Sequence, residues 1–187
     1  MSVVSVPERM RISADRYQKM VATGVLTKYD HVELIDGDMI NMAPIGPPHS
    51  AVVARLTRLF VLSLGDSAIV SPGASLKLGE YSVPQPDLML LKPRADFYAA
   101  QLPTPPDVLL LVEVSDSSLA FGRGVKRALY ARQGVAEYWV VDIPGRRLFV
   151  DREPTVDGYG EAREHRSDTV SPRALPAVQV VPEALFA

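Results

Sequence analysis

The stretch Val108-Leu109-Leu110-Leu111-Val112-Glu113-Val114 decides the fold of this chain. All of its residues except Glu113 are aliphatic, and a continuous apolar run of this length is typical of a strand that is buried on both faces of a sheet. A helical pattern follows from Leu119 to Gln133, and a second apolar strand is predicted from Tyr138 to Ile143. This strand–helix–strand unit has the length that a parallel crossover requires, so the sequence predicts an α/β protein.

Shorter elements are predicted before this unit. Ser13 is a suitable N-cap for a helix that ends before Gly24. The Asp36-Gly37 pair predicts a tight turn between extended runs at 31–36 and 38–42, which places Glu33 on a strand. The prolines and glycine in 43–48 exclude regular structure there, so we expect a loop that delivers His49. Apolar residues recur at helical spacing from Ser50 to Leu64.

Further strands are expected where short segments of high β propensity lie between Gly and Pro residues. They are 68–71, 74–78, 87–91 and 147–151, with weakly patterned edge strands after Glu153 that include 175–181. The 187 residues match the length of one ordinary domain. We therefore expect a single domain over 1–187, with a mixed, partly parallel central β-sheet flanked by helices.

The composition excludes several classes of protein. Hydrophobic residues at 47% and charged residues at 22% predict a folded core, and the absence of cysteine excludes disulfides and thiolate metal sites. A net charge of -2 argues against a protein that coats nucleic acid, although a local basic groove remains compatible with it. No apolar run is long enough for a transmembrane helix, and 1–11 lacks the apolar core of a secretory signal. We therefore expect a cytoplasmic protein with no membrane partner.

Glu113 and Asp87 are the first candidates for function. Glu113 lies among aliphatic neighbours, where an ionised carboxylate needs a partner or a cation, because its burial alone costs several kcal/mol. Asp87 directly precedes the apolar run 88–91, so its carboxylate also has apolar neighbours in the sequence. Each could instead form a structural ion pair or end a strand in solvent. Together, however, two carboxylates at the ends of neighbouring strands suit Mg²⁺ or Mn²⁺, which bind oxygen ligands.

Lys126 is the candidate cation of this site. It lies on the predicted crossover helix, which can fold back over the end of the Glu113 strand. Lys126 shares a helix face with Tyr130 and Gln133. The alternative is a solvated lysine beside Arg123 and Arg127, which is the commoner fate of a single helix lysine.

Six landmarks in this order resemble the Uma2 family, also called DUF820, of the PD-(D/E)xK restriction-endonuclease-like superfamily. They are Glu33-Leu34-Ile35-Asp36-Gly37, His49 before a helix, Pro86-Asp87, Glu113-Val114-Ser115, Lys126 before Leu129-Tyr130, and Gly134-Val135-Ala136-Glu137-Tyr138-Trp139. The resemblance runs from about Ile12 to Val150. Family members commonly have an aspartate four residues before the lysine, whereas this chain has Gly122.

The resemblance implies a role for each matching residue. Asp87 and Glu113 would be the metal ligands, with the Val114 carbonyl completing the coordination. Lys126 would be the family's migrated lysine, which replaces the superfamily lysine at the position of Ser115. Glu33 and His49 match the family's additional acidic and histidine positions, for which metal or water contacts are expected. Without the resemblance, His49 could equally be a helix-start residue with satisfied hydrogen bonds.

These expectations lead to two functional hypotheses. The first is a Mg²⁺-dependent endonuclease that hydrolyses DNA, with Mn²⁺ as a substitute and with Asp87, Glu113, Lys126, Glu33 and His49 in the site. The second is a catalytically inactive DNA-binding or assembly module of the same fold. A homodimer is also expected, because two sites related by a two-fold axis suit the two strands of a duplex. The expected contacts are 175–181 with Phe186, and the N-terminal helix with Tyr17 and Met20.

Overall fold

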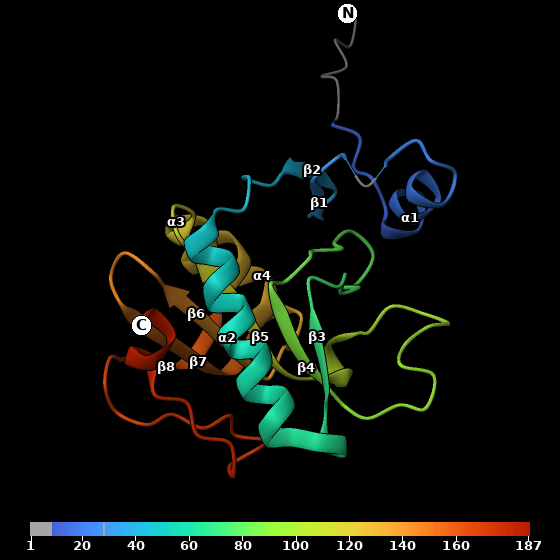
Figure 1. The fold of residues 1–187 in the computed structure, drawn as a ribbon. Helices are drawn as coiled ribbons and strands as arrows, with labels where there is room; N and C mark the ends of the chain where they lie inside the picture. Colours follow the sequence, from blue (N-terminus) through green and yellow to red (C-terminus); the bar gives the residue numbers. More distant parts are fainter. Residues whose placement is uncertain (1–8, 28) are drawn as a thin grey trace, which may run out of the picture.

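A six-stranded mixed sheet forms the centre of the protein in the computed structural model, which describes residues 9–27 and 29–187 (Figure 1). The strands are β3 (Ile69–Pro72), β4 (Leu88–Leu91), β5 (Val108–Ser115), β6 (Glu137–Asp142), β7 (Arg147–Thr155) and β8 (Gly158–His165), and they lie in that order across the sheet. Only β5 and β6 are parallel neighbours. The predicted mixed sheet is thus confirmed. The stretch 1–11, where no secretory signal is expected, lies mostly outside the described residues.

The crossover between β5 and β6 is helical but not uniform. It consists of α3 (Leu119–Phe121), a π-helical turn η3 (Gly122–Lys126) and α4 (Arg127–Arg132). The sequence predicted one continuous helix. Gly122 and Gly124 weaken the regular helix at this point, and widened turns of this kind occur frequently at functional sites. Lys126 is the last residue of the widened turn.

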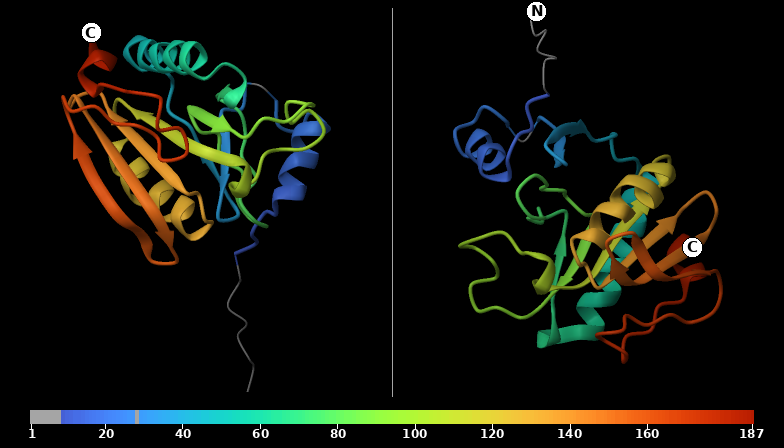
Figure 2. Two further views of the ribbon diagram at one scale, coloured as in Figure 1. Left: turned by 90° about the horizontal axis from the view of Figure 1, so that it is seen from below. Right: turned by 180° about the vertical axis from the view of Figure 1, so that it is seen from behind.

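Helices cover both faces of the sheet, as Figure 2 shows. Helix α2 (Pro47–Leu64) packs on one face through Leu56 and Phe60, against Leu110 and Val112 of β5. On the other face, α4 packs against the alternate strand residues, including Leu111. Glu113 is two residues beyond Leu111, so its side chain lies on the α4 side of the sheet.

A smaller unit lies beside one edge of the sheet. It contains α1 (Ala14–Ala22) and the hairpin of β1 (Val32–Ile35) and β2 (Asp38–Asn41). Ser13 Oγ accepts a hydrogen bond from the Arg16 N–H at 3.3 Å, which confirms the predicted N-cap. The hairpin turn needs left-handed backbone at Asp36 (φ 52°) and Gly37 (φ 86°), which explains the Asp-Gly pair.

Three predicted segments differ from the structure. Pro47 and Pro48 belong to the first turn of α2 rather than to the loop. The N–H groups in the first turn of a helix have no acceptor within the helix, so a proline at this position removes no hydrogen bond. Residues 74–78 form no strand: Leu76 N–H and Lys77 N–H donate to loop carbonyls instead. Residues 175–181 contribute a single bridge, between Val170 and Val180, rather than an edge strand. Short helical turns also occur at η1 (Gly65–Ser67), η2 (Pro105–Asp107) and η4 (Pro182–Phe186).

Some side chains of the two candidate dimer segments are buried within the chain. Tyr17 is 5% exposed and packs in a cluster with Leu34, while Val178 and Val180 are buried in the core beneath α2. These side chains are used within the chain, so they cannot form a surface contact. Within the described ranges, no helix is both long and apolar enough to cross a membrane.

Candidate active site

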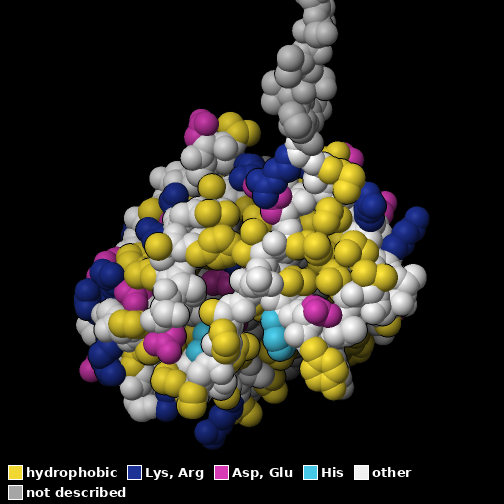
Figure 3. Space-filling view, turned by 90° about the horizontal axis from the view of Figure 1, so that it is seen from above, with side chains coloured by type: hydrophobic (Ala, Val, Ile, Leu, Met, Phe, Trp, Pro, Cys, Tyr) yellow, Lys and Arg dark blue, Asp and Glu magenta, His cyan; other side chains and the backbone are white. Residues whose placement is uncertain are grey.

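A cavity of about 340 Å³ lies where the predicted site residues meet, and we call it the catalytic cavity. Its walls include Glu33, His49, Asp87, Glu113, Val114 and Lys126. The loop between β2 and α2 closes one side through hydrophobic residues such as Ile45. Figure 3 shows this face of the molecule, where acidic and histidine side chains lie among hydrophobic ones. Residues from five separate segments of the sequence therefore share one cavity.

Lys126 joins two buried carboxylates inside this cavity. Its Nζ donates to Glu113 Oε1 and to Glu33 Oε1, each at 2.9 Å. Burial by itself would lower the pKa of Lys126, but the charges of Glu113 and Glu33 and the hydrogen bonds to both raise it above the ordinary value. Lys126 is therefore an ammonium group in this arrangement, not the solvated helix lysine that the sequence left possible.

Glu113 has one occupied and one available carboxylate oxygen. Oε1 accepts from Lys126 and from the Tyr130 hydroxyl at 2.7 Å, and these are the hydrogen bonds of this carboxylate within the described part of the chain. Burial raises the pKa of Glu113, while the charge of Lys126 opposes that rise. Burial also raises the pKa of Tyr130 well above its ordinary value, so Tyr130 remains a donor. Because both of these hydrogen bonds are to Oε1, Oε2 is available for another ligand.

Asp87 is fixed by contacts on both of its oxygens. Oδ2 accepts the backbone N–H of Val114 at 2.7 Å, and Oδ1 lies 3.0 Å from His49 Nε2. The hydrogen bond to Asp87 is the main reason that the pKa of His49 is raised. His49 lies in the first turn of α2, and its Nδ1 is buried without a hydrogen-bond partner among the described residues. Asp87 thus links the start of α2 to the end of β5.

The donor atoms of the cavity fit a hard cation with few protein ligands. Asp87 and Glu113 supply carboxylates to the lining of the cavity, which also includes Val114. Among residues 9–27 and 29–187, no group of three or more His, Cys, Asp or Glu side chains is arranged to hold a metal. Mg²⁺ usually binds one or two carboxylates and keeps several waters, so Asp87 and Glu113 are the residues that could hold such an ion.

The sequence missed the contact of Tyr130 with the cavity residue Glu113, and it missed one residue that lines the cavity. Tyr130 was placed on the Lys126 face, but its hydrogen bond to Glu113 was not foreseen, because the spacing shows the shared face and not the partner. Asp116 lines the cavity, one residue after β5 ends, and its charge adds to the rise in the pKa of His49. An acidic residue directly after a buried strand was the available signal for Asp116.

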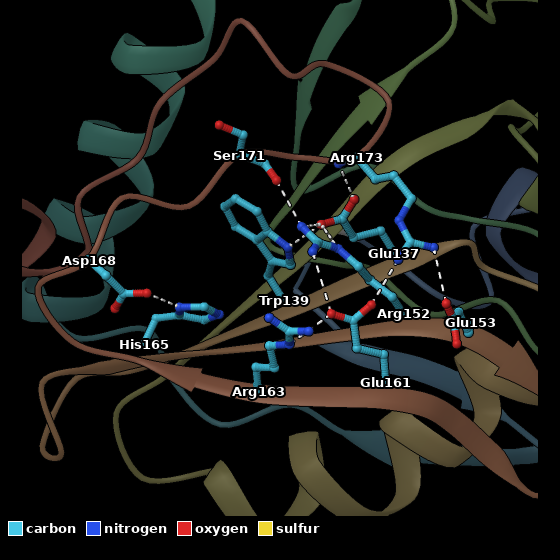
Figure 4. Close-up of polar contacts among 10 residues, drawn as sticks. All are labelled: Glu137, Trp139, Arg152, Glu153, Glu161, Arg163, His165, Asp168, Ser171 and Arg173. Atoms are coloured by element: carbon cyan, nitrogen blue, oxygen red, sulfur yellow. Dashed lines mark hydrogen bonds and ion pairs between the residues drawn. The ribbon is translucent and has the colours of Figure 1, made fainter.

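A second buried carboxylate, Glu137, lies at the start of β6 and outside the cavity (Figure 4). Its Oε1 accepts from Trp139 Nε1 and from Arg152 Nε, both at 2.8 Å, and its Oε2 accepts from the Arg173 N–H at 2.6 Å. Arg152 also donates to the Ser171 carbonyl at 2.8 Å. This cluster attaches the C-terminal segment to the sheet.

The overall fold matches that of a solved crystal structure. The structure is similar to the crystal structure of "a putative nuclease belonging to DUF820" from Anabaena variabilis, with a TM-score of 0.73 and 17% sequence identity. The similarity covers 94% of this chain and 97% of the other. A comparison with curated proteins found no match. The two proteins therefore share one fold.

The family follows from the sequence itself. The model of the Uma2 family, described as "Putative restriction endonuclease", matches residues 15–183. This chain belongs to the Uma2 family. The match confirms the resemblance found in the sequence, and it indicates a restriction-endonuclease-like nuclease.

Proposed function

We propose that this protein is a Mg²⁺-dependent endonuclease that hydrolyses phosphodiester bonds in DNA, with Mn²⁺ as a substitute. The observation that carries the proposal is the position of Lys126 beside Glu113 in the cavity that Asp87 also lines. A lysine and two carboxylates around one cavity are the groups that metal-assisted phosphodiester hydrolysis needs. The family assignment supports the same reaction class.

Each residue has a distinct role in this proposal. Asp87, Glu113 and the Val114 carbonyl would hold the cation, which polarises the phosphate and lowers the pKa of a bound water. Lys126 is already charged and orients the attacking water or stabilises the negative charge that develops on the phosphate oxygens. Glu33 holds Lys126 in place through its Oε1, and His49 does the same for Asp87.

A cleavage assay tests this proposal. Supercoiled, linear, single-stranded and branched DNA are incubated with Mg²⁺, Mn²⁺ or EDTA. We expect cleavage with either metal and none in EDTA. Lys126→Met should abolish it, whereas Lys92→Met, which changes an exposed lysine outside the cavity, should cleave as the wild type does. Cleavage by Lys126→Met at the wild-type rate would contradict the role of Lys126.

The alternative is a DNA-binding or assembly module without catalysis. It is favoured by the closed network in the cavity, where both Asp87 oxygens and the Lys126 ammonium already have protein partners. In this case Mn²⁺ would not bind. Isothermal titration with Mn²⁺ separates the two functions, because an endonuclease requires an Asp87-dependent and Glu113-dependent binding event.

We also propose that the protein forms a homodimer, since paired sites allow both strands of a duplex to be cut. The contact surface must differ from the buried side chains of Tyr17, Val178 and Val180. Light scattering at micromolar concentration should give twice the monomer mass. A strictly monomeric species would contradict the dimer and favour cleavage of one strand at a time.

A further inference from the structure

A second cavity, of about 750 Å³, adjoins the catalytic cavity, and we call it the side cavity. It lies between α1, the segment around Ser75 and the loop that leads to Thr104. Gln85 lines both cavities. Its N–H donates to Glu33 Oε1 at 2.7 Å, while its side-chain amide lies 3.4 Å from Ser75 Oγ. Gln85 is therefore a wall that the two cavities share.

The walls of the side cavity combine neutral amides with flat and apolar surfaces. Gln18 and Gln101 supply amides, while Val21 and Tyr98 supply apolar and aromatic surface. The Tyr98 ring is held in place, because its hydroxyl donates to the Lys92 carbonyl at 3.0 Å and the Arg94 guanidinium carbon lies 4.4 Å from the ring centroid. Side-chain amides can donate and accept at the edge of a nucleobase, and a fixed ring can stack on its face.

The two cavities differ in charge. Four carboxylates line the catalytic cavity, at Glu33, Asp87, Glu113 and Asp116. The described lining of the side cavity includes no carboxylate, and its charged side chain is Lys77. An anionic strand whose reacting phosphate is in the catalytic cavity therefore meets no buried negative charge when its neighbouring nucleoside enters the side cavity.

We propose that the side cavity binds the nucleoside next to the cleaved phosphodiester, with its base unpaired. Its volume lies within the roughly 300 to 1,000 Å³ of small-molecule sites. A base that is paired and stacked in a duplex cannot enter such a cavity without leaving the stack. The preferred substrate is then a strand with at least one unpaired nucleotide at the cleavage position. This inference rests on the nuclease function proposed above and defines its substrate class.

Two alanines of one loop provide the test. Ala100 and Ala95 are both exposed, and only Ala100 lines the side cavity. Ala100→Trp should fill the cavity, whereas Ala95→Trp is the matched control. The probe is a fluorescein-labelled 20-nucleotide single strand in Ca²⁺, read by anisotropy. Ala100→Trp should raise the Kd for this single strand at least about tenfold, and Ala95→Trp should leave it unchanged.

A cleavage experiment tests the preferred substrate. With Mn²⁺, the wild type should cleave a duplex with an unpaired bubble about tenfold faster than the fully paired duplex.

The outcomes separate this inference from the proposed function. Weaker binding by Ala100→Trp alone supports the side cavity as a nucleoside site, even if no DNA is cleaved, and the lack of cleavage would then refute the nuclease function. Equal Kd values for the wild type and both variants, or no binding of the single strand to the wild type, overturn the inference. Cleavage of paired DNA by Ala100→Trp at the wild-type rate would overturn it too, while leaving the nuclease function intact.

Discussion

Glu113 and Glu137 are both buried carboxylates on neighbouring parallel strands, and they differ in how completely their oxygens are used. Glu137 accepts hydrogen bonds on both oxygens, from Trp139, Arg152 and the Arg173 N–H. Glu113 accepts on Oε1 alone and faces a cavity. A saturated carboxylate holds structure together, whereas a carboxylate with a free oxygen beside a cavity can bind a ligand. The partners of a buried charge, rather than its burial, distinguish the two roles.

Glu137→Ala should give the largest loss of stability. The substitution removes the acceptor of the Trp139 N–H and the Arg173 N–H. The Arg152 guanidinium loses its buried carboxylate partner and keeps the Ser171 carbonyl. Breaking a buried pair in this way costs roughly 3–5 kcal/mol, which urea denaturation can measure. Glu153→Ala is the control, because Glu153 is exposed and lies at the edge of the same cluster. A loss below about 1 kcal/mol for Glu137→Ala would remove the structural role assigned to Glu137.

Glu113→Gln should have the opposite effects: a large loss of cleavage activity and little loss of stability. We expect cleavage to fall at least about 10³-fold, which is about 4 kcal/mol in the activation barrier, while the free energy of unfolding changes by about 1 kcal/mol or less. Stability is preserved because the amide oxygen still accepts from Lys126 and Tyr130. Initial cleavage rates and urea denaturation measure the two effects. If Glu113→Gln cleaves at the wild-type rate, or loses as much stability as Glu137→Ala, the two carboxylates do not have the different roles assigned to them.

Glu33→Gln should have an intermediate effect on activity. Lys126 keeps Glu113 as a partner but loses one charged acceptor, so its ammonium is held less firmly. We expect kcat to fall by about 10- to 100-fold with KM nearly unchanged, since the substrate does not contact Glu33 in the proposed role. Asp36→Asn, on the turn of the same hairpin, should leave both constants as they are. A change confined to KM would instead indicate that Glu33 contacts the substrate.

Tyr130→Phe should have the smallest effect. It removes one hydrogen bond to Glu113 Oε1, which is worth about 1 kcal/mol of stability. Without this bond Glu113 is less fixed, and titration calorimetry should show a severalfold weaker Mn²⁺ affinity. Tyr159→Phe removes a similar bond, from the Tyr159 hydroxyl to the Val135 carbonyl, and should change stability without changing Mn²⁺ affinity. Equal Mn²⁺ affinities in the two variants would show that Tyr130 only packs.

The sequence by itself determined the elements near the crossover. The aliphatic run of β5, the helical pattern after it and the apolar run of β6 are local signals, and each lies within about one residue of its predicted bounds. The Asp36-Gly37 turn and the Ser13 cap were local as well, because a turn or a cap depends on residues a few positions apart. The widened turn at Gly122–Lys126 was not predicted, since the same apolar spacing fits either kind of helix.

Only the tertiary structure decided what the charged residues do. Sequence selected Glu113 and Lys126, yet the acceptors of Lys126 are 13 and 93 residues away from it. Glu137 lies just before the strand predicted from Tyr138, and its partners, Arg152 and the Arg173 N–H, belong to other segments of the chain. Hydrophobic periodicity indicates which face of a helix or strand is buried. The pairing of charges depends on how distant segments meet, and no local pattern contains that information.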